Sequence, residues 1–196
     1  VGSEMCIRDI CMNAKINIKD SILETNRLVL RPFKRSDLDD FYAYAKVWGV
    51  GQMAGWLPHQ SIKQSQEILE KFIEGEKTFA IVYKNNHKVI GSIGIENLRN
   101  IDEEKLKKLK GRELGFVLSK EYWGLGIMPE AVKKVIDYLF HDCNLDFITC
   151  SYFIDNNQSK RVQEKCGFKF LKKVILPTQM QEEKEGNLNI IYKNDI

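Results

Sequence analysis

The chain has 196 residues, enough for one well-buried domain and short for two. Hydrophobic residues make up 43% and charged residues 29%, as in an ordinary globular protein, and the net charge of +3 is too small to indicate nucleic-acid binding. No apolar run approaches the roughly 18 residues that span a bilayer, and the N-terminus lacks the apolar core of a signal peptide. We therefore expect a cytoplasmic protein with no membrane partner and no direct nucleic-acid partner.

The first residues and the cysteines bear on domain organisation and metal content. Residues 1–11 precede Met12 and carry no periodic pattern, so we interpret them as a non-native or disordered leader and expect a single domain over 12–196. The five cysteines are odd in number and form no Cys-x-x-Cys pair, and three scattered histidines do not complete a zinc site. We expect free, mostly buried thiols and no metal.

The first third of the chain predicts a strand and two helices. Residues 27–32 alternate polar and apolar side chains and predict a strand ended by proline. Ser36 is expected to cap a first helix, and Ser61 with Gln64 predicts a capping box at the start of a second helix. Between these helices, residues 48–59 are too rich in glycine for regular structure and too aromatic for a solvated loop. We expect this segment either to cap the core or to form a wall of a substrate site.

The rest of the chain predicts alternating strands and helices. Ile127, Ala131, Val135 and Leu139 share one face of a predicted helix. Strands are expected at 78–83 and 89–95, which form a hairpin, and then at 113–118, 147–153, 168–170 and 188–192. A strand–helix–strand unit implies a parallel strand pair, and the flanking hairpins make the sheet mixed. The expected fold class is therefore a three-layer α/β domain.

The segment Trp123-Gly124-Leu125-Gly126-Ile127-Met128 joins two glycines to the start of that helix. Glycine lets backbone N–H groups converge on one point, and a helix N-terminus adds unpaired N–H groups and the positive end of its dipole. Pro129 suits the first turn of a helix, where its missing N–H costs nothing. The segment therefore predicts either a phosphate or pyrophosphate site or an ordinary glycine-containing turn before a helix.

A second motif follows about 30 residues later, with the pattern Asn-x-x-Ser and then Glu-Lys-x-Gly-Phe. The residues that form it are Asn156, Ser159, Glu164, Lys165, Gly167 and Phe168. Together the two segments resemble the GNAT N-acetyltransferase superfamily, in particular its RimJ/RimL-type branch of ribosomal-protein alanine acetyltransferases. Trp123 and Met128 depart from the superfamily's first motif, although Tyr-Trp-Gly-x-Gly is similar to the RimJ/RimL-type pattern. The resemblance runs from residue 23 to about residue 192.

The resemblance implies a GNAT-like fold, with a mixed central sheet, a splayed parallel strand pair around the glycine loop, and helices on both faces. It also implies acetyl-CoA as co-substrate, with its pyrophosphate wrapped by the six residues Trp123, Gly124, Leu125, Gly126, Ile127 and Met128. Asn156 would bind the pantetheine amide, with simple helix capping as the alternative. By position, the backbone N–H of Leu118 would polarise the thioester carbonyl.

Two side chains are candidates for the chemistry of acetyl transfer to an amine. A free amine is largely protonated at neutral pH, so a carboxylate must remove a proton, and by resemblance Glu113 is the general base. The alternative is that Glu113 only pairs with a nearby lysine. Ser159 resembles the serine that the family places beside the sulfur, where it would donate to the leaving thiolate. Its alternative is helix capping or a first-turn bond to the backbone.

The sequence leaves the acceptor open. The expected reaction is direct transfer in a ternary complex to a primary amine, either a protein N-terminus or a small amine such as an aminoglycoside, a polyamine or an amino acid. A non-catalytic acyl-CoA-binding module on the same fold is the competing class, and the chain is expected to be a monomer or homodimer. Trp56 is predicted to form an acceptor wall, and Asp102, Glu103 and Glu104 are predicted to attract a cationic amine.

Overall fold

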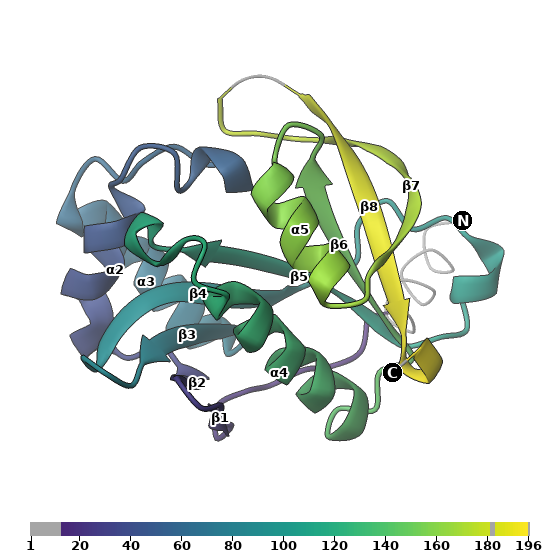
Figure 1. Ribbon diagram of the computed structural model, residues 1–196, viewed down its shortest axis with the longest axis horizontal. Coiled ribbons are helices and arrows are strands. Elements are labelled where there is room, and N and C mark those ends of the chain that lie inside the picture. The colour runs from purple at the N-terminus through teal and green to yellow at the C-terminus, as the bar shows by residue number, and fades with distance from the viewer. Residues whose placement is uncertain (1–12, 181–182, 196) are drawn as a thin grey trace.

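The computed structural model describes residues 13–180 and 183–195, so the predicted leader at 1–11 lies outside the described residues. Its centre is a mixed sheet with helices on both faces, in the strand order β1-β2-β3-β4-β5-β6-β8-β7 (Figure 1). Among the described residues the strands are β1 (Leu23–Glu24), β2 (Leu28–Pro32), β3 (Thr78–Tyr83), β4 (Lys88–Glu96), β5 (Gly111–Leu118), β6 (Phe147–Phe153), β7 (Lys169–Leu176) and β8 (Lys184–Tyr192). The helices are α2 (Leu38–Ala45), α3 (Ile62–Gly75), α4 (Ile127–His141) and α5 (Asn157–Lys165).

The two faces of the sheet are covered by different helices, and strand β3 illustrates how the sequence assigns them. Successive side chains of a strand point to opposite faces. Phe79 and Ile81 pack in the core cluster that contains α4, whereas Ala80 and Val82 pack in the cluster that contains α2 and α3. β3 is buried on both sides, which explains its continuous apolar run. The predicted three-layer arrangement is confirmed.

Helix α4 follows its predicted stripe. Ile127, Ala131, Val135 and Leu139 are all buried against the sheet. Complete burial of a side chain such as Val135 or Leu139 contributes about 1.5–3 kcal/mol relative to leaving it exposed. This packing fixes the position of the helix N-terminus beside the end of β5.

The predicted cap of the first helix is wrong. Ser36 is exposed within a 3-10 turn before α2, and the group that organises this turn is Asp37, whose carboxylate accepts the Lys34 N–H at 2.8 Å. Asp37 is held there because Arg31 donates two hydrogen bonds to it, each 2.8 Å long. Asp37 also stands at the N-cap position of α2, but its carboxylate organises the preceding turn and makes no capping hydrogen bond to the helix.

Only one of the two hydrogen bonds of the predicted capping box is present at the start of α3. Ser61 accepts the Gln64 N–H at 3.2 Å, so the N-cap is confirmed. The Gln64 side chain accepts instead from Gln60 N–H at 2.8 Å, so the reciprocal half of the predicted capping box is not made with Ser61.

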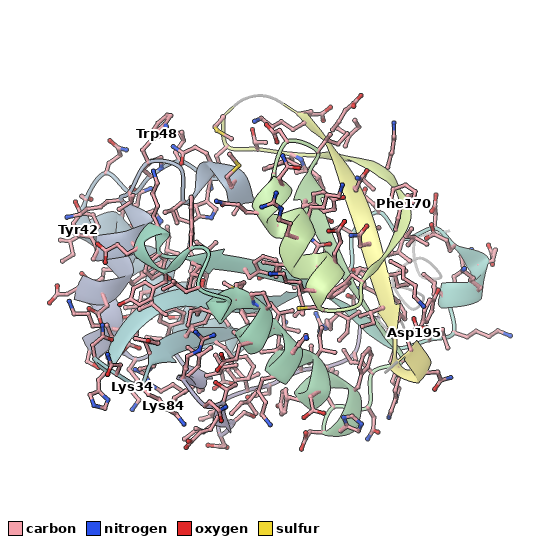
Figure 2. The ribbon with its side chains drawn as sticks, viewed as in Figure 1. Lys34, Tyr42, Trp48, Lys84, Phe170 and Asp195 are labelled. Atoms are coloured by element: carbon pink, nitrogen blue, oxygen red, sulfur yellow. The ribbon has the colours of Figure 1, made fainter. Side chains whose placement is uncertain are left out.

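The last two strands are longer than predicted. β7 is an edge strand whose residues are mostly exposed or half-exposed, so it lacks the alternation by which its length could be predicted. A register shift between Phe170 and Lys172 breaks the pattern further. Phe170 stands on the outer side of this strand, 61% exposed (Figure 2).

Candidate active site

The parallel strands β5 and β6 separate halfway along their length. They pair from Gly111 with Phe147 to Leu114 with Cys150, and no further. Beyond that point β5 continues beside β4 and β6 continues beside β8 (Figure 1). The result is a wedge-shaped opening in the middle of the sheet, as the predicted splayed pair requires.

Past Leu114, one edge of β5 is not paired with β6 and faces this opening. Ser119 donates its N–H to the Ile90 carbonyl at 2.7 Å. Hydrogen-bonded and non-hydrogen-bonded pairs alternate in an antiparallel ladder, so every second residue before Ser119 also directs its backbone groups toward β4. Phe116 and Leu118 occupy the intervening positions and direct their backbone groups away from β4. The Leu118 carbonyl accepts the indole N–H of Trp123 at 2.8 Å, which leaves the Leu118 N–H facing the opening.

The glycine loop adopts the conformation that its two glycines allow. Gly124 has φ +77° and Gly126 has φ +73°, both left-handed, and Gly126 immediately precedes the first residue of α4. A Cβ atom at Gly124 would meet nothing within 4 Å, and one at Gly126 would meet only the Arg27 guanidinium at 3.7 Å. The glycines are therefore needed for backbone direction, and the space beside the loop is open to a ligand.

A brace from the start of the sheet holds the glycine loop. Arg27 donates from Nη1 to the Leu125 carbonyl at 3.0 Å and from Nε to Glu130 at 2.8 Å. Thr25 donates its hydroxyl to the same carboxylate at 2.5 Å. Burial opposes ionisation of Glu130, but these hydrogen bonds outweigh it and hold its pKa below the ordinary value. Sequence reasoning missed this brace, although Thr25 and Arg27 lie where the family resemblance begins.

Glu113 lies on β5 just before the strands separate, and its side chain is 2% exposed. Its Oε1 accepts from Arg99 Nη2 at 3.0 Å and from the Ser151 hydroxyl at 2.8 Å, while Oε2 accepts the Arg99 backbone N–H at 3.3 Å. The charge partner is therefore Arg99, not the lysine considered from sequence. One acceptor position of this carboxylate stays available, because four lone-pair sites face three donors.

Both ends of the Asn156 amide form a hydrogen bond within the protein. Its Oδ1 accepts the Ser159 N–H at 3.0 Å, which caps α5, and its Nδ2 donates to the Met53 carbonyl at 3.0 Å. The capping alternative considered from sequence is therefore present, and the second bond ties α5 to the segment 48–59. Ser159 is half-buried in the first turn of α5, where its hydroxyl oxygen accepts from Gln163 Nε2 at 3.2 Å.

A cavity of about 470 Å³ joins these features through the opening in the sheet. Every residue predicted for the site lines it except Leu125, which is 56% exposed and contributes its carbonyl to the Arg27 brace. The predicted residues that line it are Glu113, Leu118, Trp123, Gly124, Gly126, Ile127, Met128, Asn156 and Ser159. The glycine loop and Ser159 thus share one space with Glu113.

Cys150 also lines the cavity but is poorly suited to act as a nucleophile. Burial raises its pKa well above the ordinary value, and the neighbouring Glu113 charge raises it further. The reactive form of cysteine is the thiolate, so Cys150 stays a protonated thiol at neutral pH. Cys143 and Cys166 are also free thiols, while Cys6 and Cys11 lie outside the described residues.

The segment 48–59 contributes Val50, Met53 and Ala54 to the cavity wall. Trp56 has a different role from the one predicted, because its ring packs on Gly51, where a Cβ atom would lie 2.2 Å from the indole, and on His59 at 5.2 Å. Trp48 points outward at 72% exposure (Figure 2). The segment therefore both caps the core and walls the cavity, with Met53 and Ala54 in place of Trp56.

Asp102, Glu103 and Glu104 lie in the charged loop 99–112 and do not line the cavity, contrary to the prediction. Lys172 on β7 pairs with Asp102 and, at 3.1 Å, with Glu103, while Glu104 pairs with Lys107. What the loop supplies to the cavity is Arg99, a cation. The prediction that these acidic residues attract a cationic acceptor is therefore wrong.

The described residues offer neither a metal-binding cluster nor a membrane-spanning helix. Across residues 13–180 and 183–195, no group of three or more His, Cys, Asp and Glu side chains is arranged to hold a metal ion. In the same part of the chain, no helix combines the length and apolar character needed to cross a bilayer.

Comparison with known proteins identifies the family. Residues 27–169 match the acetyltransferase (GNAT) domain. The uncharacterized N-acetyltransferase p20 of Bacillus licheniformis is 30% identical over 152 residues, which cover 74% of this chain and 81% of that protein.

Two solved structures share the fold. The ribosomal-protein-S5-alanine acetyltransferase of Vibrio fischeri has a TM-score of 0.69 at 24% identity, covering 90% of this chain and 98% of that one. The spermidine N-acetyltransferase of Vibrio cholerae, in complex with CoA and spermine, has a TM-score of 0.71 at 18% identity, covering 87% and 98%. The chain belongs to the GNAT family and is an acetyl-CoA-dependent N-acetyltransferase.

Proposed function

We propose that this chain, as a single catalytic domain over 12–196, transfers an acetyl group from acetyl-CoA directly to the α-amine of a peptide or amino acid in a ternary complex. The observation that carries the proposal is the single cavity that runs from the glycine loop through the opened sheet to Glu113. Free thiols at Cys143, Cys150 and Cys166 suit the reducing conditions of the cytoplasm.

The glycine loop and the exposed edge of β5 would hold the donor. Backbone N–H groups of residues 124–128 converge at the N-terminus of α4, an arrangement that suits a pyrophosphate. Trp123 fixes the strand end through its bond to Leu118, and the Leu118 N–H would donate to the thioester carbonyl as negative charge develops there. Asn156 caps α5 through Oδ1 and donates one Nδ2 hydrogen to the Met53 carbonyl, and its second N–H would bind the pantetheine amide.

Glu113 and Ser159 would supply the proton transfers. Glu113 accepts a proton from the acceptor ammonium, and the neutral amine nitrogen then forms the new C–N bond while the C–S bond breaks. Ser159 donates to the departing thiolate, which leaves as a thiol. The new amide nitrogen releases its surplus proton to solvent, and the Ser159 hydroxyl regains a proton from solvent. Cys150 is held protonated, which supports direct transfer without an acyl-cysteine intermediate.

The charges of the cavity favour an α-amine over a polyamine. Among the described residues that line the cavity, Glu113 is the single carboxylate, whereas a polyamine carries several cationic groups. Arg99 lines the same wall, and its side chain is 55% exposed, so its guanidinium can donate to the carbonyl adjacent to an α-amine. The ribosomal-protein enzyme and the spermidine enzyme among the fold neighbours represent these two acceptor classes.

A screen of acceptors tests the proposal. We expect acetyl-CoA-dependent thiol release with short peptides or amino acids at rates well above those with spermidine or aminoglycosides at matched concentration. Mass spectrometry of the product should find the acetyl group on the α-nitrogen. A preference for polyamines would contradict the proposed acceptor, and CoA binding without turnover on any amine would favour a binding module.

A further inference from the structure

A buried amide pair lies beneath Ser159. Gln163, one turn further along α5, is completely buried and donates from Nε2 to the Ser159 hydroxyl at 3.2 Å and to the Ser151 carbonyl at 3.4 Å. Its Oε1 accepts from Asn189 Nδ2 at 3.0 Å, and Asn189, on β8, is 5% exposed. The three residues form a chain from β8 through the interior to the cavity wall.

The direction of these hydrogen bonds is fixed by chemistry. A backbone carbonyl can only accept, so the end of Gln163 that faces Ser151 must be its NH₂ group. The same NH₂ group faces Ser159, whose oxygen therefore accepts. The opposite end of Gln163 is then an oxygen, and it requires the NH₂ group of Asn189. Each amide in the chain determines the orientation of the next.

This polarity determines what Ser159 can do. A serine in a helix commonly donates its hydroxyl proton to a nearby backbone carbonyl. Among the described residues, the hydrogen-bond partner of this hydroxyl is Gln163, which donates to it, so the proton of Ser159 is left for another acceptor. Ser159 lines the cavity, and an acceptor in that cavity is the group it can reach.

The amide pair carries a cost that packing alone does not explain. Within the part of the chain that the structure describes, Asn189 Oδ1 is buried without a hydrogen-bond partner. A buried unsatisfied carbonyl destabilises a core, and an apolar side chain of similar size would avoid this. An arrangement that costs stability and points toward a cavity is typical of a functional network.

We infer that Gln163 and Asn189 are positioning residues that hold Ser159 as a hydrogen-bond donor toward the cavity, where the departing thiolate develops its charge. The inference rests on the proposed function, in which Ser159 donates to that sulfur. Gln163 and Asn189 act through Ser159 and touch no reacting atom.

A double-mutant cycle tests the inference. Gln163→Met keeps length and removes the donor, and we expect kcat to fall about tenfold in the wild-type background, with the KM for acetyl-CoA within about twofold. In the Ser159→Ala background the same substitution should leave kcat unchanged, because there is no hydroxyl to orient. Gln66→Met, on the exposed side of α3, is the matched control and should not change kcat.

A second variant guards against a folding defect. Asn189→Leu removes the group that orients Gln163, and it should lower kcat in the same direction with the same dependence on Ser159, while circular dichroism confirms the fold. Equal losses from Gln163→Met with and without Ser159 would overturn the inference, as would full turnover of Ser159→Ala. Both results leave acetyl transfer by the wild type intact, whereas an inactive wild type would contradict the proposed function as well.

Discussion

Glu113 is a buried carboxylate beside a cavity. Burial of a charge is unfavourable unless it is paired and hydrogen-bonded, and here Arg99 and Ser151 supply three bonds. Ser151 lies on β6, so the two strands on either side of the opening both contact the carboxylate. Such a group is held in place and still has one position open to a substrate.

The prediction at this residue is that Glu113→Gln removes the base while keeping the size of the side chain. The rate of acetyl transfer at pH 7 should fall by roughly 10²–10⁴, the usual contribution of a general base.

Glu96 supplies the control for that variant. It lies opposite Glu113 in the ladder between β4 and β5 and is exposed, so Glu96→Gln should keep near-full activity. Near-full turnover of Glu113→Gln at pH 7 would mean that the base lies elsewhere or that the amine arrives already neutral.

At the scale of elements, the segment 48–59 is held against α2 and α3 by His59. This side chain is buried, lies 5.3 Å from the ring of Phe41, and shares a hydrogen bond of 2.6 Å between its Nδ1 and the Ser65 hydroxyl. Burial lowers the pKa of His59 below its ordinary value because it penalises the charged imidazolium. The buried position of His59 against α2 and α3 therefore favours the neutral imidazole.

The pH dependence of stability follows from this shift. Between the lowered pKa and the ordinary value near 6.5, the unfolded state binds more protons, so the free energy of unfolding falls as pH drops below about 6.5. It levels off once the folded protein is protonated as well, and above about 6.5 this group contributes no slope. Denaturant titrations between pH 5 and 8 measure the effect.

Two variants make this second prediction specific to His59. His59→Asn should have lower stability throughout but lack this part of the pH slope, while His141→Asn, at the exposed end of α4, should retain it. An identical slope in His59→Asn and the wild type would contradict the assignment.

At the scale of the whole molecule, the sequence predicts what depends on neighbours in the chain. The α4 stripe, the hairpin and the glycine loop were predictable because each pattern repeats within a few residues. The contacts that complete the site were not, because they join distant segments. Arg27 is 103 residues from Glu130, and Asn189 is 26 residues from Gln163.

The errors have the same origin. Ser36 matched the pattern of an N-cap, but Arg31 from the preceding strand organises Asp37 instead. The acidic loop matched the pattern of a cation-attracting surface, but a lysine on the edge strand, Lys172, neutralises it. In each case the local pattern is present in the sequence, but a side chain from a distant segment or another element determines what the residue contacts.

Binding of CoA at the glycine loop is the central claim, and charge at Gly126 tests it most directly. Gly126→Asp and Gly126→Asn share the strain of a side chain at φ +73° and are nearly equal in size, so only the charge differs. Titration calorimetry with CoA should give measurable binding for the wild type, weaker binding for Gly126→Asn, and none detectable for Gly126→Asp, with similar melting temperatures for the two variants. Wild-type affinity in Gly126→Asp would contradict the account.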